Sequence, residues 1–205
     1  SEMCIRDSTW AALMIRLSGQ DELVVGQPQS VRSHAVLEPL VGCLVNTVPL
    51  RISAPSEGSY LRAMRGVHKE LLEGLEHAEV PFYQIVQVLN PTRSSRHNPL
   101  FQTIMQLLPR GTGAKTEDRT FDWLRSIGTG SVAIDLWMNL EERDDGALTG
   151  SLTYDTAIFR EATACWLAAQ LVSVLRHAVA VPSDAVGMIP VSAPRTVVPG
   201  RPLCG

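Results

Sequence analysis

The hydrophobic pattern changes period near Ser59, and this change constrains the fold more than any other feature of the chain. Residues 44–52 (LVNTVPLRI) alternate, which predicts a strand with the even-numbered residues on one face. From Ser59 to His77 apolar residues recur every three or four positions, which predicts an amphipathic helix with Ser59 as its N-cap. Pro49 indicates that the strand lies at a sheet edge or is bulged. A strand and a long helix in succession indicate an α/β protein.

The same reasoning predicts the other elements. They are a helix at Trp10–Leu17, a strand at Leu23–Gly26, a long loop at Gln27–Glu38, a helix at Pro81–Leu89, a strand at Leu100–Leu108, a hairpin of Val132–Leu140 and Leu148–Tyr154, and a helix at Arg160–Val181 whose apolar face carries Trp166, Ala169, Val172, Leu175 and Val179. Strands and helices mix without strict βαβ alternation. We therefore expect an α/β layered sandwich.

Composition narrows the class of protein. A chain of 205 residues that is 45% hydrophobic suits one globular unit with a sizeable core. A net charge of −3 without a basic stripe argues against a nucleic-acid partner, and no run approaches the roughly 18 apolar residues that would cross a membrane. The cysteines form no CxxC pair, so we expect no zinc site and no disulfide framework. We interpret Cys43 and Cys165 as small buried hydrophobes and expect a cytoplasmic protein.

Both ends differ in character from the rest of the chain. Residues 2–8 match the translation of a transposase adapter used in sequencing libraries, so we expect residues 1–8 to be an adapter artefact outside the fold. Residues 192–205 are rich in proline and valine, which predicts a linker. The expected folded unit is therefore residues 9–191.

A search for a reaction centre finds little. The five histidines, His34, His68, His77, His97 and His177, have no metal-binding spacing, so no metal is expected. No GxSxG elbow is present, and the Gly-rich stretches do not match a phosphate loop. One feature suggests more than a structural role: two polar residues, Asn46 and Thr47, lie inside an apolar strand. A buried carboxamide needs hydrogen-bond partners, so Asn46 either stitches a neighbouring loop or faces a polar cavity.

Three segments resemble motifs of the condensation domains of nonribosomal peptide synthetases. The motif (I/V)GxFVNTxxxR is matched by residues 41–51 (VGCLVNTVPLR), and (H/N)QDxPFE is matched loosely by residues 77–83 (HAEVPFY). The motif RDxSRNPLFQ is matched by residues 93–102 (RSSRHNPLFQ). The flanks agree as well, so the resemblance covers about Trp10 to Val191.

The resemblance implies a chloramphenicol-acetyltransferase-like layered sandwich of which this chain is the C-terminal lobe. It implies amide-bond formation between two thioesters carried on phosphopantetheine, with no cofactor bound directly. Implied partners are upstream and downstream peptidyl carrier domains, an adjoining adenylation domain and an N-terminal lobe; no nucleic acid or membrane is implied. The loop 27–40 would floor the substrate tunnel, and residues 109–131 would cross to the other lobe.

The resemblance also assigns residues. Asn46 and Thr47 become candidates for the wall of the substrate tunnel. The residues expected to shape the motifs structurally are Gly42, Arg51, His77, Pro81, Phe82, Arg93, Asn98 and Pro99. Arg93 is expected to order its own turn through nearby carbonyl groups.

Departures from the family pattern set limits. Leu44 stands where the family has Phe, Ala78 where it has Gln, Ser94 where it has Asp, and Arg96 where it has Ser. The HHxxxDG motif with the family's catalytic histidine is absent, so no catalytic residue is expected here and the isolated chain should be inactive. Epimerization and heterocyclization domains of the same superfamily remain alternatives, as does a non-catalytic carrier-docking scaffold. The epimerization signatures WFTxxYP and FNYLG are also absent.

Overall fold

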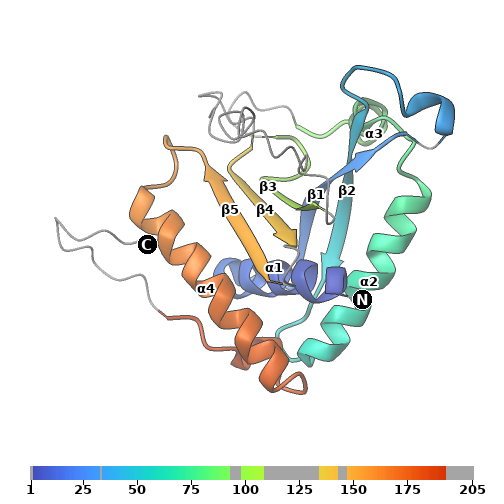
Figure 1. Ribbon diagram of the computed structural model, residues 1–205. Coiled ribbons are helices and arrows are strands. Elements are labelled where there is room, and N and C mark those ends of the chain that lie inside the picture. Colours follow the sequence, from blue (N-terminus) through green and yellow to red (C-terminus); the bar gives the residue numbers. More distant parts are fainter. Residues whose placement is uncertain (1, 33, 93–97, 109–133, 143–146, 193–205) are drawn as a thin grey trace.

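A five-stranded mixed sheet organises the described part of the chain in the computed structural model (Figure 1), which comprises residues 2–32, 34–92, 98–108, 134–142 and 147–192. The elements in chain order are α1 (Glu2–Ser18), β1 (Glu22–Ser30), the 3-10 turn η1 (Ala35–Leu37), β2 (Val45–Ser53), α2 (Tyr60–Glu76), α3 (Phe82–Leu89), β3 (Thr103–Leu108), β4 (Leu136–Glu142), β5 (Leu148–Tyr154), α4 (Glu161–Ala180) and the 3-10 turn η3 (Val186–Met188). The α/β prediction is confirmed.

The strand order β2-β1-β3-β4-β5 places β2 and β5 at the two edges of the sheet. β2 pairs antiparallel with β1, and Pro49 stands opposite Gly26, so the predicted edge position of the proline is confirmed. β3 is parallel to both β1 and β4. β4 and β5 form the predicted antiparallel hairpin, with Leu136 opposite Tyr154.

Helices α1, α2 and α4 cover one face of the sheet, with α1 lying across between the other two (Figure 1). Trp10 and Leu13 of α1 are fully buried, and they lie in the same core as Val67 of α2 and Val174 of α4. The Trp10 indole N–H also donates to Oγ1 of Thr103 on β3 at 3.1 Å. Apolar burial on this face therefore joins elements that are far apart in the sequence.

A smaller apolar cluster occupies the opposite face of the sheet. It contains Phe101, Ile104 and Ile134, against which Phe82 of α3 and Trp137 of β4 pack. The Phe82 and Phe101 rings have centroids 5.4 Å apart at a tilt of 57°, a favourable aromatic arrangement. This cluster anchors α3 to the sheet.

Close packing explains one glycine of the sheet, Gly26 on β1. A Cβ atom added to Gly26 would lie 2.5 Å from the Phe101 ring. The ring therefore needs a residue without a side chain at this point on the strand.

Several boundaries differ from the prediction. β3 begins at Thr103 rather than at Leu100, and β4 runs from Leu136 to Glu142 rather than from Val132 to Leu140. α1 begins at Glu2 rather than at Trp10. β1 continues to Ser30, so the predicted loop starts later, because Gln27–Ser30 pair with Val45–Val48 of β2. Pro28 fits within β1 because β1 pairs with β3 only at Val25 and Gly26, so no β3 partner needs the missing N–H of the proline.

The predicted apolar face of α4 is wrong. The helix buries Ala164, Leu167, Gln170, Leu171, Val174 and Ala178. Val172 and Val179 of the predicted face are exposed, as is Ala169. Because α4 is apolar around most of its circumference, periodicity could not select the buried side. Among the described residues, α4 is long and apolar enough to cross a membrane by length and composition, as the core helices of soluble proteins also can be.

The interpretation of the two cysteines is also corrected. Cys43 is exposed, because it precedes β2 and its apolar neighbours do not enter the sheet core. Cys165 lies half-buried on α4 and is disulfide-bonded. Its partner is not among the described side chains.

Candidate functional site

Asn46 on β2 holds the connection between α2 and α3 against the sheet. Its Nδ2 donates to the carbonyl oxygens of Ala78 at 2.8 Å and Val80 at 2.7 Å. Its Oδ1 accepts from the N–H of Phe82 at 3.1 Å. All three partners are main-chain groups, and their spacing matches the two donors and one acceptor face of a carboxamide. The sequence left two roles open for Asn46. These contacts match the first role, in which Asn46 holds a neighbouring loop, here the α2–α3 connection.

The sequence around this connection forms it locally. His77 is the C-cap of α2, and its N–H donates to Gly74 and Leu75. Pro81 precedes the first turn of α3 in an extended conformation and Asn90 ends the helix in the left-handed region at φ 41°, as the sequence predicted for Pro81–Leu89. Two motif segments that are distant in sequence, residues 41–51 and 77–83, therefore meet at the Asn46 side chain.

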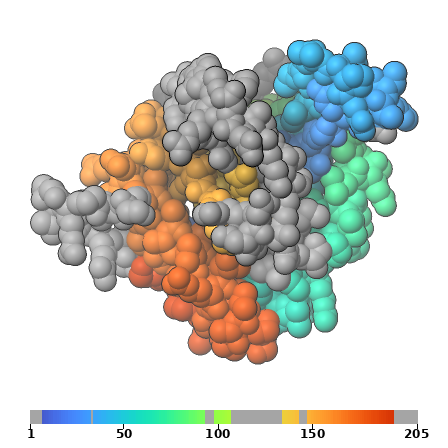
Figure 2. All heavy atoms as spheres, in the orientation of Figure 1, coloured from blue at the N-terminus to red at the C-terminus, as the bar shows by residue number. Residues whose placement is uncertain are grey.

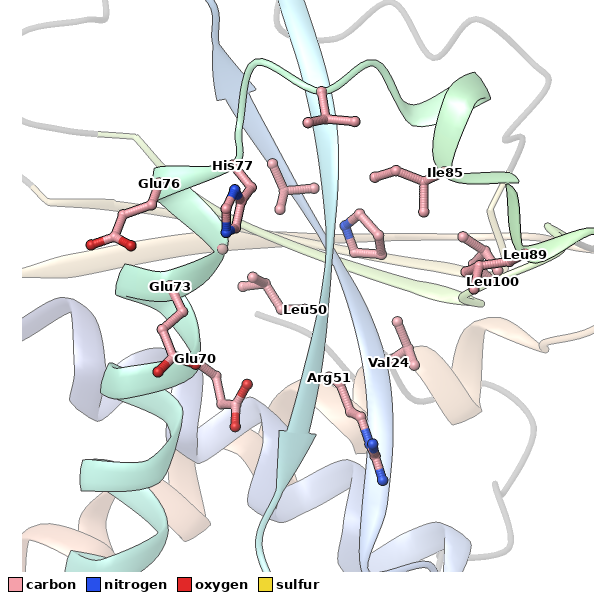
Figure 3. A pocket seen from close by; sticks show the side chains of 14 residues that line it. Val24, Leu50, Arg51, Glu70, Glu73, Glu76, His77, Ile85, Leu89 and Leu100 are labelled. Carbon is pink, nitrogen blue, oxygen red and sulfur yellow. The ribbon is translucent and has the colours of Figure 1, made fainter. Parts of the chain in front are cut away.

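A groove lies next to this connection, between β2, α2 and α3 (Figure 3). Its cavity measures about 730 Å³. Leu50 and Val24 come from the two strands, while Ile85 and Leu89 come from α3. The wall from α2 carries the carboxylates Glu70, Glu73 and Glu76, followed by His77. The groove thus has apolar strand and α3 walls and an acidic α2 wall.

Arg51 carries the positive charge at the strand side of the groove. Its guanidinium binds Oε2 of Glu22 through Nη2 at 2.6 Å and Nε at 3.1 Å, and both side chains are largely exposed. The hydrogen bond and the charge of Glu22 raise the pKa of Arg51, with a smaller contribution from Glu70. Arg51 therefore stays charged and serves as a surface contact between β1 and β2.

The third motif ends in a turn built by Asn98. Its Oδ1 accepts from the N–H groups of Leu100 at 3.0 Å and Phe101 at 3.3 Å. The turn, which includes the half-buried Pro99, aims Phe101 into the cluster that anchors α3. Asn98 therefore acts through local main-chain contacts, as an Asx turn does.

The remaining predicted site residues are placed as follows. Thr47 is half-buried on β2, opposite Pro28. Gly42 is exposed in the loop before β2. Arg93 and the predicted crossover at residues 109–131 lie outside the described residues. The tunnel assignments of Asn46 and Thr47 stay predictions.

Two polar residues were missed by the sequence analysis. Arg32 donates to several carbonyl groups of the β1–β2 loop, and Tyr60 forms buried hydrogen bonds with Ser8 and Thr9 at 2.8 Å each. A tyrosine at the start of an amphipathic helix could have indicated a buried hydroxyl contact. Nothing in the sequence marked Arg32, because its acceptors are main-chain oxygens.

The chemistry available in the described residues is that of binding and positioning. No cluster of three or more potential metal ligands occurs among them. The groove presents the carboxylates of α2, the imidazole of His77 and the guanidinium of Arg51. The Asn46 carboxamide binds main-chain groups of the α2–α3 connection. The fold and the site therefore define an α/β unit with a groove between β2, α2 and α3.

The comparisons with known proteins name this lobe. A family profile described as "Condensation domain" matches residues 5–194. The chain belongs to the condensation domain family of nonribosomal peptide synthetases. Phosphinothricin tripeptide synthetase PhsB of Streptomyces viridochromogenes is 34% identical over 188 residues, which is 90% of this chain and 16% of the synthetase. The chain thus spans less than a fifth of that relative.

Two solved structures agree on the fold. The first condensation domain of the CDA synthetase matches 93% of this chain and 42% of its own length, with a TM-score of 0.75 and 16% identity. The four-domain nonribosomal peptide synthetase holo-AB3403, bound to AMP and glycine, matches 94% of this chain and 16% of its own length, with a TM-score of 0.78 and 21% identity. The predicted family and the predicted single chloramphenicol-acetyltransferase-like lobe are confirmed.

Proposed function

We propose that this chain is the C-terminal lobe of a condensation domain that forms amide bonds between two carrier-bound thioesters. The observation that carries the proposal is that the chain matches the family over nearly its whole length but covers less than half of a solved condensation domain. The family profile matches residues 5–194, whereas the chain equals only 42% of a solved condensation domain. A second lobe with the HHxxxDG motif would supply the rest, and residues 192–205 would be a linker. The expected start of the folded unit at residue 9 is too late, because α1 begins at Glu2 and Ser8 is buried against Tyr60.

The proposed reaction joins the amine of the acceptor substrate to the thioester carbonyl of the donor. The C–N bond forms and the C–S bond breaks. The carrier's phosphopantetheine leaves as the thiol, and the attacking nitrogen loses a proton. A histidine on the other lobe would assist that proton transfer, so the isolated lobe has no turnover of its own. Phosphopantetheine is here the arm of the substrates and not a bound cofactor.

The lobe's own contribution is a wall of the substrate tunnel. Asn46 fixes the α2–α3 connection, and Thr47 is next to it on β2. These contacts support a positioning role for Asn46 beside the tunnel, where Thr47 would be a second polar residue of the wall. Partners would be the carrier domains on either side and an adenylation domain, in a cytoplasmic assembly line.

The test begins with the coding sequence upstream of this chain. We expect it to encode HHxxxDG within about 150–200 residues, the size of a half-domain of this kind. The completed domain should transfer a donor aminoacyl group onto an acceptor aminoacyl carrier, detected as a mass increase of the acceptor carrier. Replacing the second histidine of the motif by alanine is the matched control. An upstream region that encodes no such lobe contradicts the proposal.

A further inference from the structure

The outer edge of β2 pairs with no other strand among the described residues, because β2 ends the sheet and bonds only β1. At its two ends, the N–H of Val31 donates to the Leu44 carbonyl at 3.0 Å, and the N–H of Ala54 donates to the Asp21 carbonyl at 3.1 Å. Hydrogen-bonded positions alternate along an antiparallel strand, so the even-numbered residues from 44 to 54 face β1 and the odd-numbered ones face outward. The odd position of Pro49, which has no N–H, fits this register.

This edge offers hydrogen bonds to an added strand. The main-chain N–H and carbonyl groups of Thr47, Arg51 and Ser53 point outward, as does the Pro49 carbonyl. No residue in the described part of the chain bonds any of these groups. An edge of this kind is a template for pairing with another chain, and Pro49 withholds only its own donor.

The groove between β2, α2 and α3 follows the same edge. Val48 and Leu50 line it from the face of β2 that α2 covers, and a Cβ atom added to Gly74 of α2 would clash with Leu50. Pro49 and Arg51 line it from the opposite face, because successive side chains of a strand point to opposite sides. A cavity lined by both sets surrounds the edge of the strand instead of lying on one face.

The α2 side of the groove carries negative charge. Glu70, Glu73 and Glu76 line it, and Figure 3 shows their carboxylates on the same side of β2. Glu73 pairs with Lys69 at 3.5 Å, whereas Glu70 and Glu76 form no ion pair with any described residue. In Figure 2 α2, coloured teal to green, lies at the right-hand margin of the molecule, so its outer side meets solvent. A basic side chain that enters here meets carboxylates without a counter-ion.

The α3 side of the groove is apolar. Ile85, Leu89 and Leu100 line it, on the other side of β2 from the carboxylates (Figure 3), and Leu89 is 61% exposed. A strand added to β2 would direct alternate side chains to opposite faces of the sheet. One set would meet the acidic side of the groove and the other set its apolar side.

We propose that the β2 edge binds an extended segment of another polypeptide, in which basic and apolar residues alternate, as an added strand of the sheet. The main-chain groups of the edge supply the pairing, and the two unlike sides of the groove select the sequence. This inference does not rest on amide-bond formation by the chain.

Two other occupants fit the groove less well. Pairing the β2 edges of two copies of this chain would bring two acidic α2 helices together. The chain's own C-terminal tail starts from the other end of the sheet. Ser192 is bonded there to Trp166 and Gln170 of α4, which lies beside β5 (Figure 1).

The proposal is tested with an acetylated heptapeptide in which lysine and valine alternate, added to the 205-residue chain. On binding, we expect the amides of Thr47 and Arg51 to exchange about tenfold more slowly, whereas those of Val48 and Leu50, already bonded to β1, should not change. A peptide of the same composition with its lysines and valines in separate blocks is the control, and it should bind about tenfold more weakly. Absence of binding, or binding that leaves the Thr47 and Arg51 amides unprotected, overturns strand addition.

A pair of variants separates the main chain of the edge from its side chain. Arg51→Ala and Arg51→Pro both remove the guanidinium, but only proline removes the outward N–H, and an edge strand accepts proline at such a position. Relative to Arg51→Ala, we expect Arg51→Pro to bind the alternating peptide about fivefold more weakly or worse, as the loss of one hydrogen bond implies. Equal affinity of the two variants contradicts the proposal.

The charge of the groove is tested separately, which also covers the case that Arg51→Pro does not fold. Glu70→Gln combined with Glu76→Gln should weaken binding about threefold or more at low ionic strength and less at high salt. An unchanged affinity overturns selection of basic residues. Slow exchange of the Thr47 and Arg51 amides before any peptide is added would mean that a segment of this chain or a second copy occupies the edge, and would overturn the proposal.

Discussion

Two regions of the molecule are stabilised by different forces. One is the face of the sheet covered by α1, α2 and α4, and the other, the motif end, comprises the β1–β2 loop (residues 31–32 and 34–44) and the α2–α3 connection at residues 77–82. The first is closed by large apolar side chains, Trp10, Leu13 and Val67 among them. The second is closed by polar side chains, Asn46 and Arg32, that bind main-chain carbonyl groups. Apolar residues at this second end, such as Val41 and Val88, remain exposed.

The contrast shows how each region is stabilised. Apolar burial holds the helices α1, α2 and α4 on the sheet. Polar stitches fix the shape of a loop while leaving its apolar side chains free to meet another surface. The motif end therefore has a definite shape although apolar residues such as Val41 stay exposed.

The largest expected effect is that of Trp10→Ala in the core. Removing a fully buried indole should lower the free energy of unfolding by about 3–5 kcal/mol, measured by urea titration. Val179→Ala, an exposed apolar position on α4, should change it by roughly 0.5 kcal/mol or less. If Trp10→Ala lowered the free energy of unfolding no more than Val179→Ala does, burial of Trp10 would not be what stabilises the core.

Asn46→Ala should have a smaller and more local effect. It leaves two carbonyl groups and one N–H of the α2–α3 connection without their side-chain partner, which costs about 1–3 kcal/mol. The Phe82 amide should exchange faster with solvent, while amides in α4 should not. Thr47→Ala, on the next residue of β2, is the control. If Asn46→Ala destabilised the whole molecule as much as Trp10→Ala, the two regions would not be energetically distinct.

Tyr60→Phe sharpens the comparison, because it removes a polar contact from the core side. Loss of the hydroxyl that binds Ser8 and Thr9 should cost about 1 kcal/mol at neutral pH. Burial raises the pKa of Tyr60 above its ordinary value of 10.0, although the hydrogen bonds from Ser8 and Thr9 oppose this shift.

The sign of the pH dependence follows from that shift. The folded protein keeps the Tyr60 proton to a higher pH than the unfolded chain does. The associated stability is therefore complete below pH 10 and is lost as the pH rises through the raised pKa of the folded state. Urea titrations between pH 8 and 11 should show a steeper alkaline loss for the wild type than for Tyr60→Phe. Parallel curves would contradict the role assigned to the hydroxyl.

The smallest expected effect belongs to Arg51→Ala at the surface. Its ion pair with Glu22 is exposed, so the urea midpoint should not change measurably at physiological salt. Only at low ionic strength should the variant differ from the wild type. A large loss of stability at physiological salt would show that this exposed ion pair stabilises the fold directly.

Elements with local signals were predictable from the sequence. Ser59 was expected to cap α2, and its side chain does accept from the N–H of Arg62. Pro81 and the residue after Leu89 likewise bound α3 as expected. In each case the residues that fix the boundary lie within one helical turn of it.

Features set by distant pairing were not predictable. β1 extends over Gln27–Ser30 only because β2 lies beside it. The buried face of α4 is chosen by contact with α1 and β5, and its own apolar pattern allowed two answers. Arg32 escaped notice because every residue offers a carbonyl acceptor, so no pattern of side chains marks its partners.

The most direct test of the account is the mass of the acceptor carrier after incubation with a loaded donor carrier. We expect no increase with the 205-residue chain alone, and an increase equal to the donor acyl group once an upstream lobe carrying HHxxxDG is joined to it. Acyl transfer by the chain alone would contradict the view that this lobe supplies shape and surface while its partner supplies the chemistry.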